Sequence, residues 1–199
     1  MANHVYFGVG INGNEKCLKA FKDVMVTEKS HFYTDTDGKK HYHDTVIDID
    51  KLGFMPVGTY DEDDYLENSW EYYVNNVGAK WCHIEDLGEE YFSGYSAWSP
   101  PVELIEYLST YLFQFDSNHT IKMSYEDEFR NFIGVAHVEG GISSVEELEW
   151  DEISEWLTTE LGIEELGEDF DWFEPREELG DIPADEWLDY KVCDWQEEN

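Results

Sequence analysis

A group of aspartates at residues 61–64 is the first candidate for chemistry. Asp61, Asp63 and Asp64 lie in the string YDEDDYLEN, and clustered carboxylates hold Mg²⁺ in many enzymes. An enzyme of that kind also needs Lys or Arg for the phosphates of its substrate, but residues 61–141 contain only three cations. The sequence therefore favours an acidic surface patch over a magnesium site.

Two histidines beside an aspartate-rich string are the second candidate. YTDTDGKKHYHD is similar to a calcium-binding loop, but Tyr33 and Asp44 stand at its first and last ligand positions, which weakens coordination. His41 and His43 fall on one face of a predicted strand and could bind a divalent metal, but no third ligand is evident. Asp-Gly at 37–38 lies between two β-rich runs, so we predict a β-hairpin over about 30–45 and no metal site.

The cysteines do not predict an enzyme. They are widely spaced and form no CxxC, so no disulfide framework, zinc site or iron–sulfur site is indicated: Cys17, Cys82 and Cys193. Cys82 and His83 are adjacent, so on a strand they would point to opposite faces and could not act as a pair. A distant histidine, His119 or His137, could approach Cys82, but nothing in the sequence indicates it. GxSxG, P-loop and GxGxxG motifs are absent, so we predict no enzyme and no cofactor.

Negative charge is the dominant property of the chain. Its 199 residues include 47 acidic and 12 basic ones, for a net charge of −35. Residues 142–199 alone carry 22 acidic residues against two cations. Such a field repels nucleic acid and anionic membranes and attracts basic partners. We therefore expect no direct binding to DNA, RNA or a membrane.

The acidic segment is nevertheless built to fold. Residues 144–175, SVEELEWDEISEWLTTELGIEELGEDFDWFEP, contain 13 carboxylates and no Lys or Arg, together with three tryptophans and several leucines and isoleucines. Disordered acidic chains are poor in aromatic residues, whereas 16% of this chain is aromatic. We expect residues 142–199 to be ordered, mainly helical and packed on the rest of the protein, with one or two tryptophans exposed as interface anchors.

A capping box predicts where the acidic helix begins. Ser144 and Glu147 have S-x-x-E spacing, and apolar residues recur on one helical face until about Gly162. Residues three or four apart are neighbours on a helix. The predicted row and its neighbouring carboxylates are Glu147, Asp151, Glu155, Glu146, Glu149 and Glu152.

Such a row can imitate the phosphates of a nucleic-acid duplex, which carries one charge per ~1.7 Å of its axis. Like charges at this spacing destabilise a helix, and a sequence selected only for solubility would usually interleave Lys. We therefore predict that these carboxylates, with Asp61, Asp63 and Asp64, bind a basic protein in place of nucleic acid. Two alternatives stay open: a solvated acidic surface, and a structural or assembly protein, such as a homodimer, that uses an acidic interface.

The element pattern predicts an α+β fold. Strands are expected at 4–11, 90–98, 119–125 and 130–138, and helices at 15–26, 65–74 and after Ser99, which would cap a helix with prolines in its first turn. This order suits a ferredoxin-like antiparallel sheet with helices on one face, followed by an acidic helical C-terminal extension. Gly140-Gly141 marks the predicted boundary between a domain at 1–141 and a region at 142–199.

Several strings resemble those of one family. They are MANHV at the start, LGFMPV, NNVGAKW, SAWSPPVELIEYLS and MSYEDEFRNFIGV. Together they are similar to the YubB-like family of phage and plasmid proteins. The Trp-Gly-Thr-Lys-Trp string of that family is represented by Gly78, Lys80 and Trp81, with Val77 and Ala79 at its first and third positions. The resemblance covers about residues 1–140 in patches.

The resemblance implies a ferredoxin-like domain and a mobile-element origin, but it supplies no catalytic residues. A mobile element encounters host defences, so the expected partner is a host defence nuclease, restriction complex or CRISPR effector. The chain start lacks a signal-peptide pattern, and no apolar stretch approaches a membrane span, so we expect a cytoplasmic location.

Overall fold

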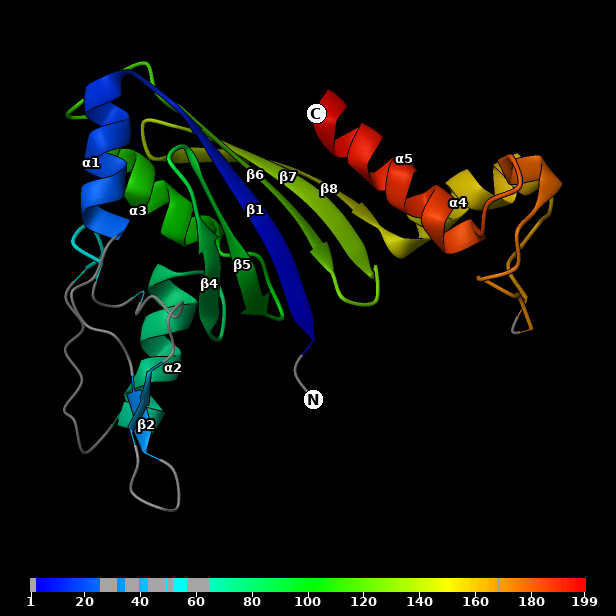
Figure 1. Ribbon diagram of the computed structural model, residues 1–199, viewed down its shortest axis with the longest axis horizontal. Helices are drawn as coiled ribbons and strands as arrows, with labels where there is room; N and C mark the ends of the chain where they lie inside the picture. The colour runs from blue at the N-terminus through cyan, green and yellow to red at the C-terminus, as the bar shows by residue number, and fades with distance from the viewer. Residues whose placement is uncertain are drawn as a thin grey trace.

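The computed structural model describes residues 3–25, 32–34, 40–42, 49, 52–56, 65–167 and 169–199. The described chain is an α+β fold around an antiparallel, open, six-stranded sheet of order β4-β5-β1-β6-β7-β8 (Figure 1). The strands are β1 (His4–Asn12), β4 (Cys82–Leu87), β5 (Tyr91–Ala97), β6 (Thr120–Asp127), β7 (Phe132–Glu139) and β8 (Ile142–Glu149). The α-helices are α1 (Glu15–Met25), α2 (Tyr65–Asn76), α3 (Val102–Leu112), α4 (Trp150–Leu161) and α5 (Ala184–Glu198), and a 3₁₀ helix, η3, spans Glu177–Leu179.

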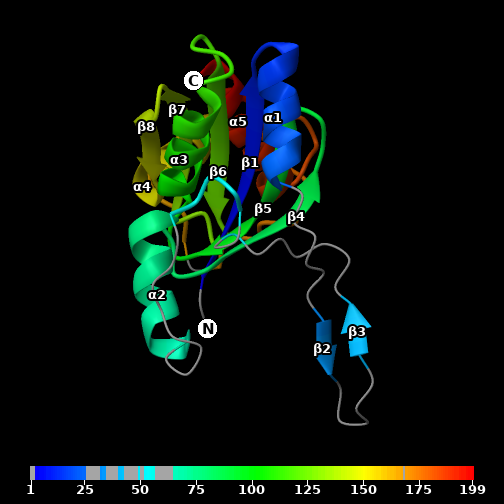
Figure 2. The ribbon, with the colours of Figure 1, turned by 90° about the vertical axis from the view of Figure 1, so that its left-hand side faces the viewer.

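One face of the sheet carries the main core. Strand β1 alternates between buried and outward-facing residues, as a strand with one covered face must. Helices α1 and α3 lie on this first face, in front of the sheet in Figure 2, with α5 behind it. The apolar stripe of α3 is buried there, with Ile105, Leu108 and Leu112 all at 0% exposure. The predictions of β1, α1, α2, β5, β6 and β7 are confirmed within a few residues.

The predicted hairpin is present as far as the structure describes it. Strands β2 (Phe32–Thr34) and β3 (Lys40–Tyr42) pair antiparallel, with Tyr33 opposite His41. Residues 35–39, which include the predicted Asp37-Gly38 turn, lie outside the described residues, as do His43 and Asp44.

The start of α3 differs from its prediction. Ser99 does not cap the helix: the helix begins at Val102, and Pro101 is its N-cap residue. The Ser99 hydroxyl instead donates a hydrogen bond to the carbonyl of Gly78 at 2.6 Å. Ser99 therefore ties the loop before α3 to the segment that follows α2.

The largest difference concerns residues 142–149, where the predicted helix is wrong. These residues form β8, which pairs along its whole length with β7, from Glu139 opposite Ile142 to Phe132 opposite Glu149. Helix α4 begins only at Trp150, although it ends at Leu161, with Gly162 as its C-cap residue, close to the predicted end. The predicted boundary at 141–142 falls in the Gly140-Gly141 turn of the β7–β8 hairpin, so residues 142–149 belong to the sheet.

Candidate functional site

The C-terminal region, residues 142–199, supplies strand β8 of the sheet and two helices, α4 and α5, that pack against the second face of the sheet. Ile133 of β7 points away from α1 and α3, yet it is fully buried. It forms a cluster with Ile153 of α4 and with Leu188 and Val192 of α5. Five half-buried tryptophans pack around this and the adjoining cluster: Trp150, Trp156, Trp172, Trp187 and Trp195.

The outside of this region is almost purely anionic. Every described carboxylate residue in it is exposed except Asp185, which is half-buried. Its two cations turn toward aromatic rings. The Arg176 guanidinium lies 4.5 Å from the ring centre of Phe170, and Lys191 Nζ lies 5.3 Å from that of Trp187. Among the described residues, the ion pair that reaches this region comes from the sheet domain, where Arg130 contacts Asp189.

The structure breaks up the predicted row of carboxylates. Glu147 lies on β8 and not on a helix, so it does not continue the line of Asp151 and Glu155. Its carboxylate accepts a hydrogen bond from the hydroxyl of Tyr125, at 2.7 Å. Burial and this hydrogen bond raise the pKa of Tyr125 well above its ordinary value. Glu147 therefore has a structural role: it fastens the outermost strand to β6.

Two further predicted site residues cap α4. The carboxylate of Glu152 accepts a hydrogen bond from the backbone N–H of Glu149, at 3.1 Å, in a capping box five residues later than the predicted one. Glu146, Asp151 and Glu155 are exposed. Asp151 and Glu155 are one turn apart on α4, so these two keep the predicted neighbourhood.

The second predicted acidic patch cannot be placed. Asp61, Asp63 and Asp64 lie outside the described residues, just before α2. Within the part of the chain that the structure describes, no group of three or more His, Cys, Asp or Glu residues could hold a metal ion.

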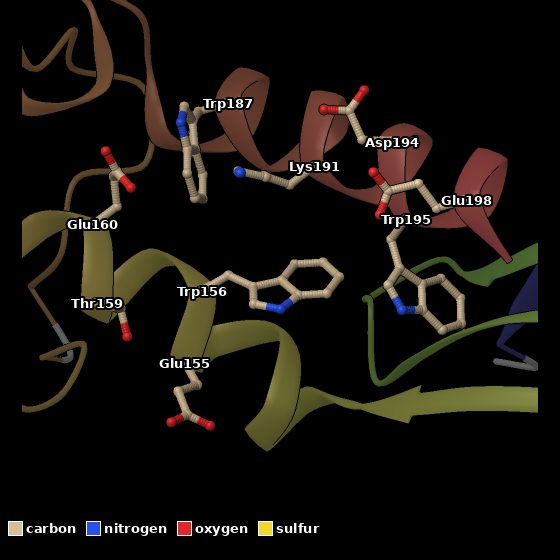
Figure 3. Close-up of a pocket in the computed structure, with 9 residues that line it drawn as sticks. All are labelled: Glu155, Trp156, Thr159, Glu160, Trp187, Lys191, Asp194, Trp195 and Glu198. Atoms are coloured by element: carbon tan, nitrogen blue, oxygen red, sulfur yellow. The ribbon is translucent and has the colours of Figure 1, made fainter.

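A cavity of about 500 Å³ lies between α4 and α5 (Figure 3). From α4, Trp156 extends into it, and from α5, Trp187, Lys191 and Trp195 do. The rest of the lining is Glu155, Thr159, Glu160, Asp194 and Glu198. We call this the α4–α5 cavity.

The spacing of the tryptophans in the sequence is a signal for this cavity, although the many carboxylates around them draw attention away from it. Trp187, Lys191 and Trp195 are spaced by four residues, so on a helix they share one face. Trp156 and Glu160 have the same spacing on α4. The expectation that one or two tryptophans of the region serve as anchors did not identify which ones line a cavity.

The cysteine–histidine pair is arranged as the sequence predicts. Cys82 is buried on the first face of the sheet, and burial raises the pKa of its thiol. The next side chain, His83, lies on the second face beside Trp81 and Tyr95. His119 is buried, but its ring bonds to Ser109 and to the Asp116 carbonyl. Cys82 is thus a core residue.

An aromatic cluster on the second face of the sheet is not predicted by the sequence. His4, Tyr6, Trp81, His83 and Tyr95 have ring centroids 5.3 to 6.4 Å apart. A sequence signal for it exists in β1 and β5, where His4, Tyr6 and Tyr95 are among the residues that alternate with the buried ones and point away from the main core. Tyr6 is exposed and the other four rings are half-buried, so this cluster is open to solvent in part.

No family model matches the chain, and no curated protein or solved structure matches it either. None of the described helices combines the length and apolar character that a membrane span requires.

Proposed function

We propose that this protein binds a basic protein at a nucleic-acid-binding groove, in place of the nucleic acid. The observation that carries the proposal is the charge of the folded C-terminal region. Nearly all its described carboxylates are exposed, and its own two cations lie against aromatic rings. The counter-charge for these carboxylates would therefore come from a partner.

The ends of the two helices support this proposal. The C-terminal end of a helix carries partial negative charge, so cations stabilise it and carboxylates destabilise it by about 0.3–1 kcal/mol each at low salt. Neither α4 nor α5 has a basic residue in its last turn, where α4 holds Glu160 and α5 holds Glu197 and Glu198. Lys or Arg at these positions would make the isolated protein more stable. A cationic partner would offset the destabilisation that these carboxylates cause. Solubility alone does not require carboxylates at the ends of the helices.

A fixed scaffold also suits long-range attraction. Because α4 and α5 are anchored on Ile133 and its neighbours, their carboxylates keep set positions and form a field of one sign. Such fields accelerate association with a partner of opposite charge. Asp151, Glu155 and Glu146 are the predicted phosphate-like residues that remain exposed and for which no hydrogen bond of the carboxylate is described. We therefore propose that these three residues bind the partner, in preference to Glu147, Glu149 and Glu152.

We also propose that the first part of the chain is ferredoxin-like. In the order β4-β5-β1-β6, α1 precedes β4 and α3 joins β5 to β6, which is a split βαβ arrangement with β7 and β8 added. This topology agrees with the fold that the resemblance to YubB-like proteins implies, and the resemblance itself supports a mobile-element origin. The partner class we propose is a bacterial defence nuclease, restriction complex or CRISPR effector.

A pull-down tests the proposal. The immobilised protein is exposed to bacterial lysate at low and high salt, with and without competing duplex DNA. We expect a nucleic-acid-binding protein that salt releases and that DNA displaces. The variant Glu146→Gln/Asp151→Asn/Glu155→Gln should lose most of this partner.

The matched control removes three charges elsewhere, as Glu71→Gln/Glu85→Gln/Glu90→Gln, at exposed positions of the sheet domain. It should retain the partner. Equal loss in both variants would show that only net charge matters. A captured protein that ignores both salt and DNA, or salt-insensitive self-association, would support the assembly alternative.

A further inference from the structure

The α4–α5 cavity has aromatic walls on both sides. Trp156 comes from α4, and Trp187 and Trp195 come from α5, so both helices contribute an indole to the same space (Figure 3). All three indoles are half-buried. The face of an indole attracts cations through its quadrupole, more strongly than the rings of Tyr or Phe do.

The rim of the cavity is anionic. Glu155, Glu160, Asp194 and Glu198 line it, and Figure 3 shows the carboxylates of Glu155 and Asp194 directed away from its centre. Glu160 and Glu198 lie in the last turns of α4 and α5, where the helix ends add partial negative charge. A cation that enters between the indoles would therefore be attracted by the rim and by both helix ends.

One cation already lies in the cavity. Lys191 is the single lysine of the C-terminal region, and its side chain runs along the cavity toward Trp187 (Figure 3). Its Nζ lies 5.3 Å from the ring centre of Trp187. Among the described residues it forms no ion pair within 4 Å. In the protein without a partner, the aromatic wall of the cavity thus already lies against an ammonium group, that of Lys191.

We propose that the α4–α5 cavity binds an arginine side chain of the basic partner, which displaces Lys191 from the face of Trp187. This inference rests on the proposed function and deepens it. Arginine is favoured over lysine because its planar, weakly hydrated guanidinium stacks on aromatic faces. The volume, about 500 Å³, lies in the range of ligand pockets and exceeds what one guanidinium needs. It has room for the whole side chain.

Calorimetric titration of the full chain with two peptides tests this proposal. Nona-arginine and nona-lysine carry equal charge, so the long-range attraction of the acidic surface is the same for both, and the variants below separate the cavity from the pairing of guanidinium groups with surface carboxylates. With the cavity in use, we expect nona-arginine to bind about fivefold more tightly or better. The double variant Glu160→Gln/Glu198→Gln should reduce this preference. The matched double variant Glu164→Gln/Glu165→Gln, on exposed residues outside the cavity lining, should retain it.

Lys191 provides a test that does not disturb the packing of the indoles. Lys191→Met removes the resident cation and keeps most of the side-chain length. It should tighten binding of nona-arginine more than Lys16→Met, which removes one positive charge from exposed α1. Equal effects of these two substitutions, or equal affinities of the two peptides for the unaltered protein, would overturn the cavity proposal. If the peptides bind equally and in a salt-dependent way, the proposed function survives; if neither binds, both proposals fall.

Discussion

Tyr125→Phe tests the assignment of Glu147 as a structural residue. Tyr125 is 2% exposed, and its hydroxyl reaches across β7 to the carboxylate of Glu147 on β8. The ring crosses β7 at Gly134, where even a Cβ would lie 2.2 Å from the phenol. Strand β8 is the outermost strand of the described sheet, and this hydrogen bond is one of the side-chain links that hold it, as are those between Ser143 and Glu106.

The magnitude follows from the type of bond. A hydrogen bond to a charged group contributes about 1.5–3 kcal/mol. Because Glu147 is exposed and water can replace part of the lost bond, we take the lower end, about 1.5 kcal/mol. For a chain of this length that corresponds to a decrease of about 3–6 °C in Tm.

Thermal unfolding measured at several pH values is the assay. Since the pKa of Tyr125 is raised in the folded protein, its contribution is fully present below the unfolded value of about 10. Above that pH the unfolded chain loses the phenol proton more readily than the folded protein does. The contribution of Tyr125 to the free energy of unfolding therefore decreases, by up to about 1.4 kcal/mol per pH unit. The difference between the original protein and Tyr125→Phe should therefore shrink above pH 10.

Tyr190→Phe is the matched control, because Tyr190 donates a similar hydrogen bond to Glu186 but is 58% exposed. We expect it to change the free energy of unfolding by less than about 0.5 kcal/mol. Equal Tm values for Tyr125→Phe and Tyr190→Phe would refute the structural role of Glu147. Glu147 would then be available to bind a partner, as predicted from the sequence.

Three further predictions concern the sheet domain and the thiols. A thiol reagent should modify one cysteine of the native protein, the exposed Cys193, and reach Cys17 and Cys82 only after unfolding, because burial raises the pKa of both thiols; three fast-reacting thiols would contradict this. Gly94→Ala should lower stability by about 2 kcal/mol or more in denaturant unfolding, since its Cβ would lie 1.9 Å from a backbone carbonyl of β4. Two backbone N–H groups lower the pKa of Asp116, so Asp116→Ala should lower Tm at neutral pH, and the loss should disappear as pH falls well below about 4.

The first strand and the helices on the first face could be predicted because local pattern and tertiary environment agree there. In β1, inward Val5, Phe7 and Val9 alternate with residues that face away from the main core. In α3, the apolar stripe has helical spacing and meets the sheet. Patterns of this kind depend only on residues close in sequence, so they survive without knowledge of the fold.

Strand β8 could not be predicted in this way. Val145 and Leu148 are three apart and continue toward Ile153, which is a helical spacing across what is in fact a strand-to-helix junction. The strand forms because its backbone pairs with β7, a contact that propensity does not encode. Strand β4 also has no clear sequence pattern, since an irregularity between Ile84 and Asp86 disturbs its alternation.

The candidate site was only partly predictable. Counting charges located the acidic region, but not which carboxylates are committed to the fold. Glu147, Glu149 and Glu152 look like Asp151 and Glu155 in the sequence, and hydrogen bonds to distant or capping groups distinguish them. The α4–α5 cavity joins helices separated by more than twenty residues, so its two walls come together only through packing on Ile133.

Competition for a partner's nucleic-acid groove tests the central claim most directly. A fluorescent duplex is bound to the captured partner, and its anisotropy is followed as this protein is added. We predict displacement of the duplex by the unaltered protein and by Glu71→Gln/Glu85→Gln/Glu90→Gln, with much weaker displacement by Glu146→Gln/Asp151→Asn/Glu155→Gln. A ternary complex in which the duplex stays bound would contradict the claim that this acidic region takes the place of nucleic acid.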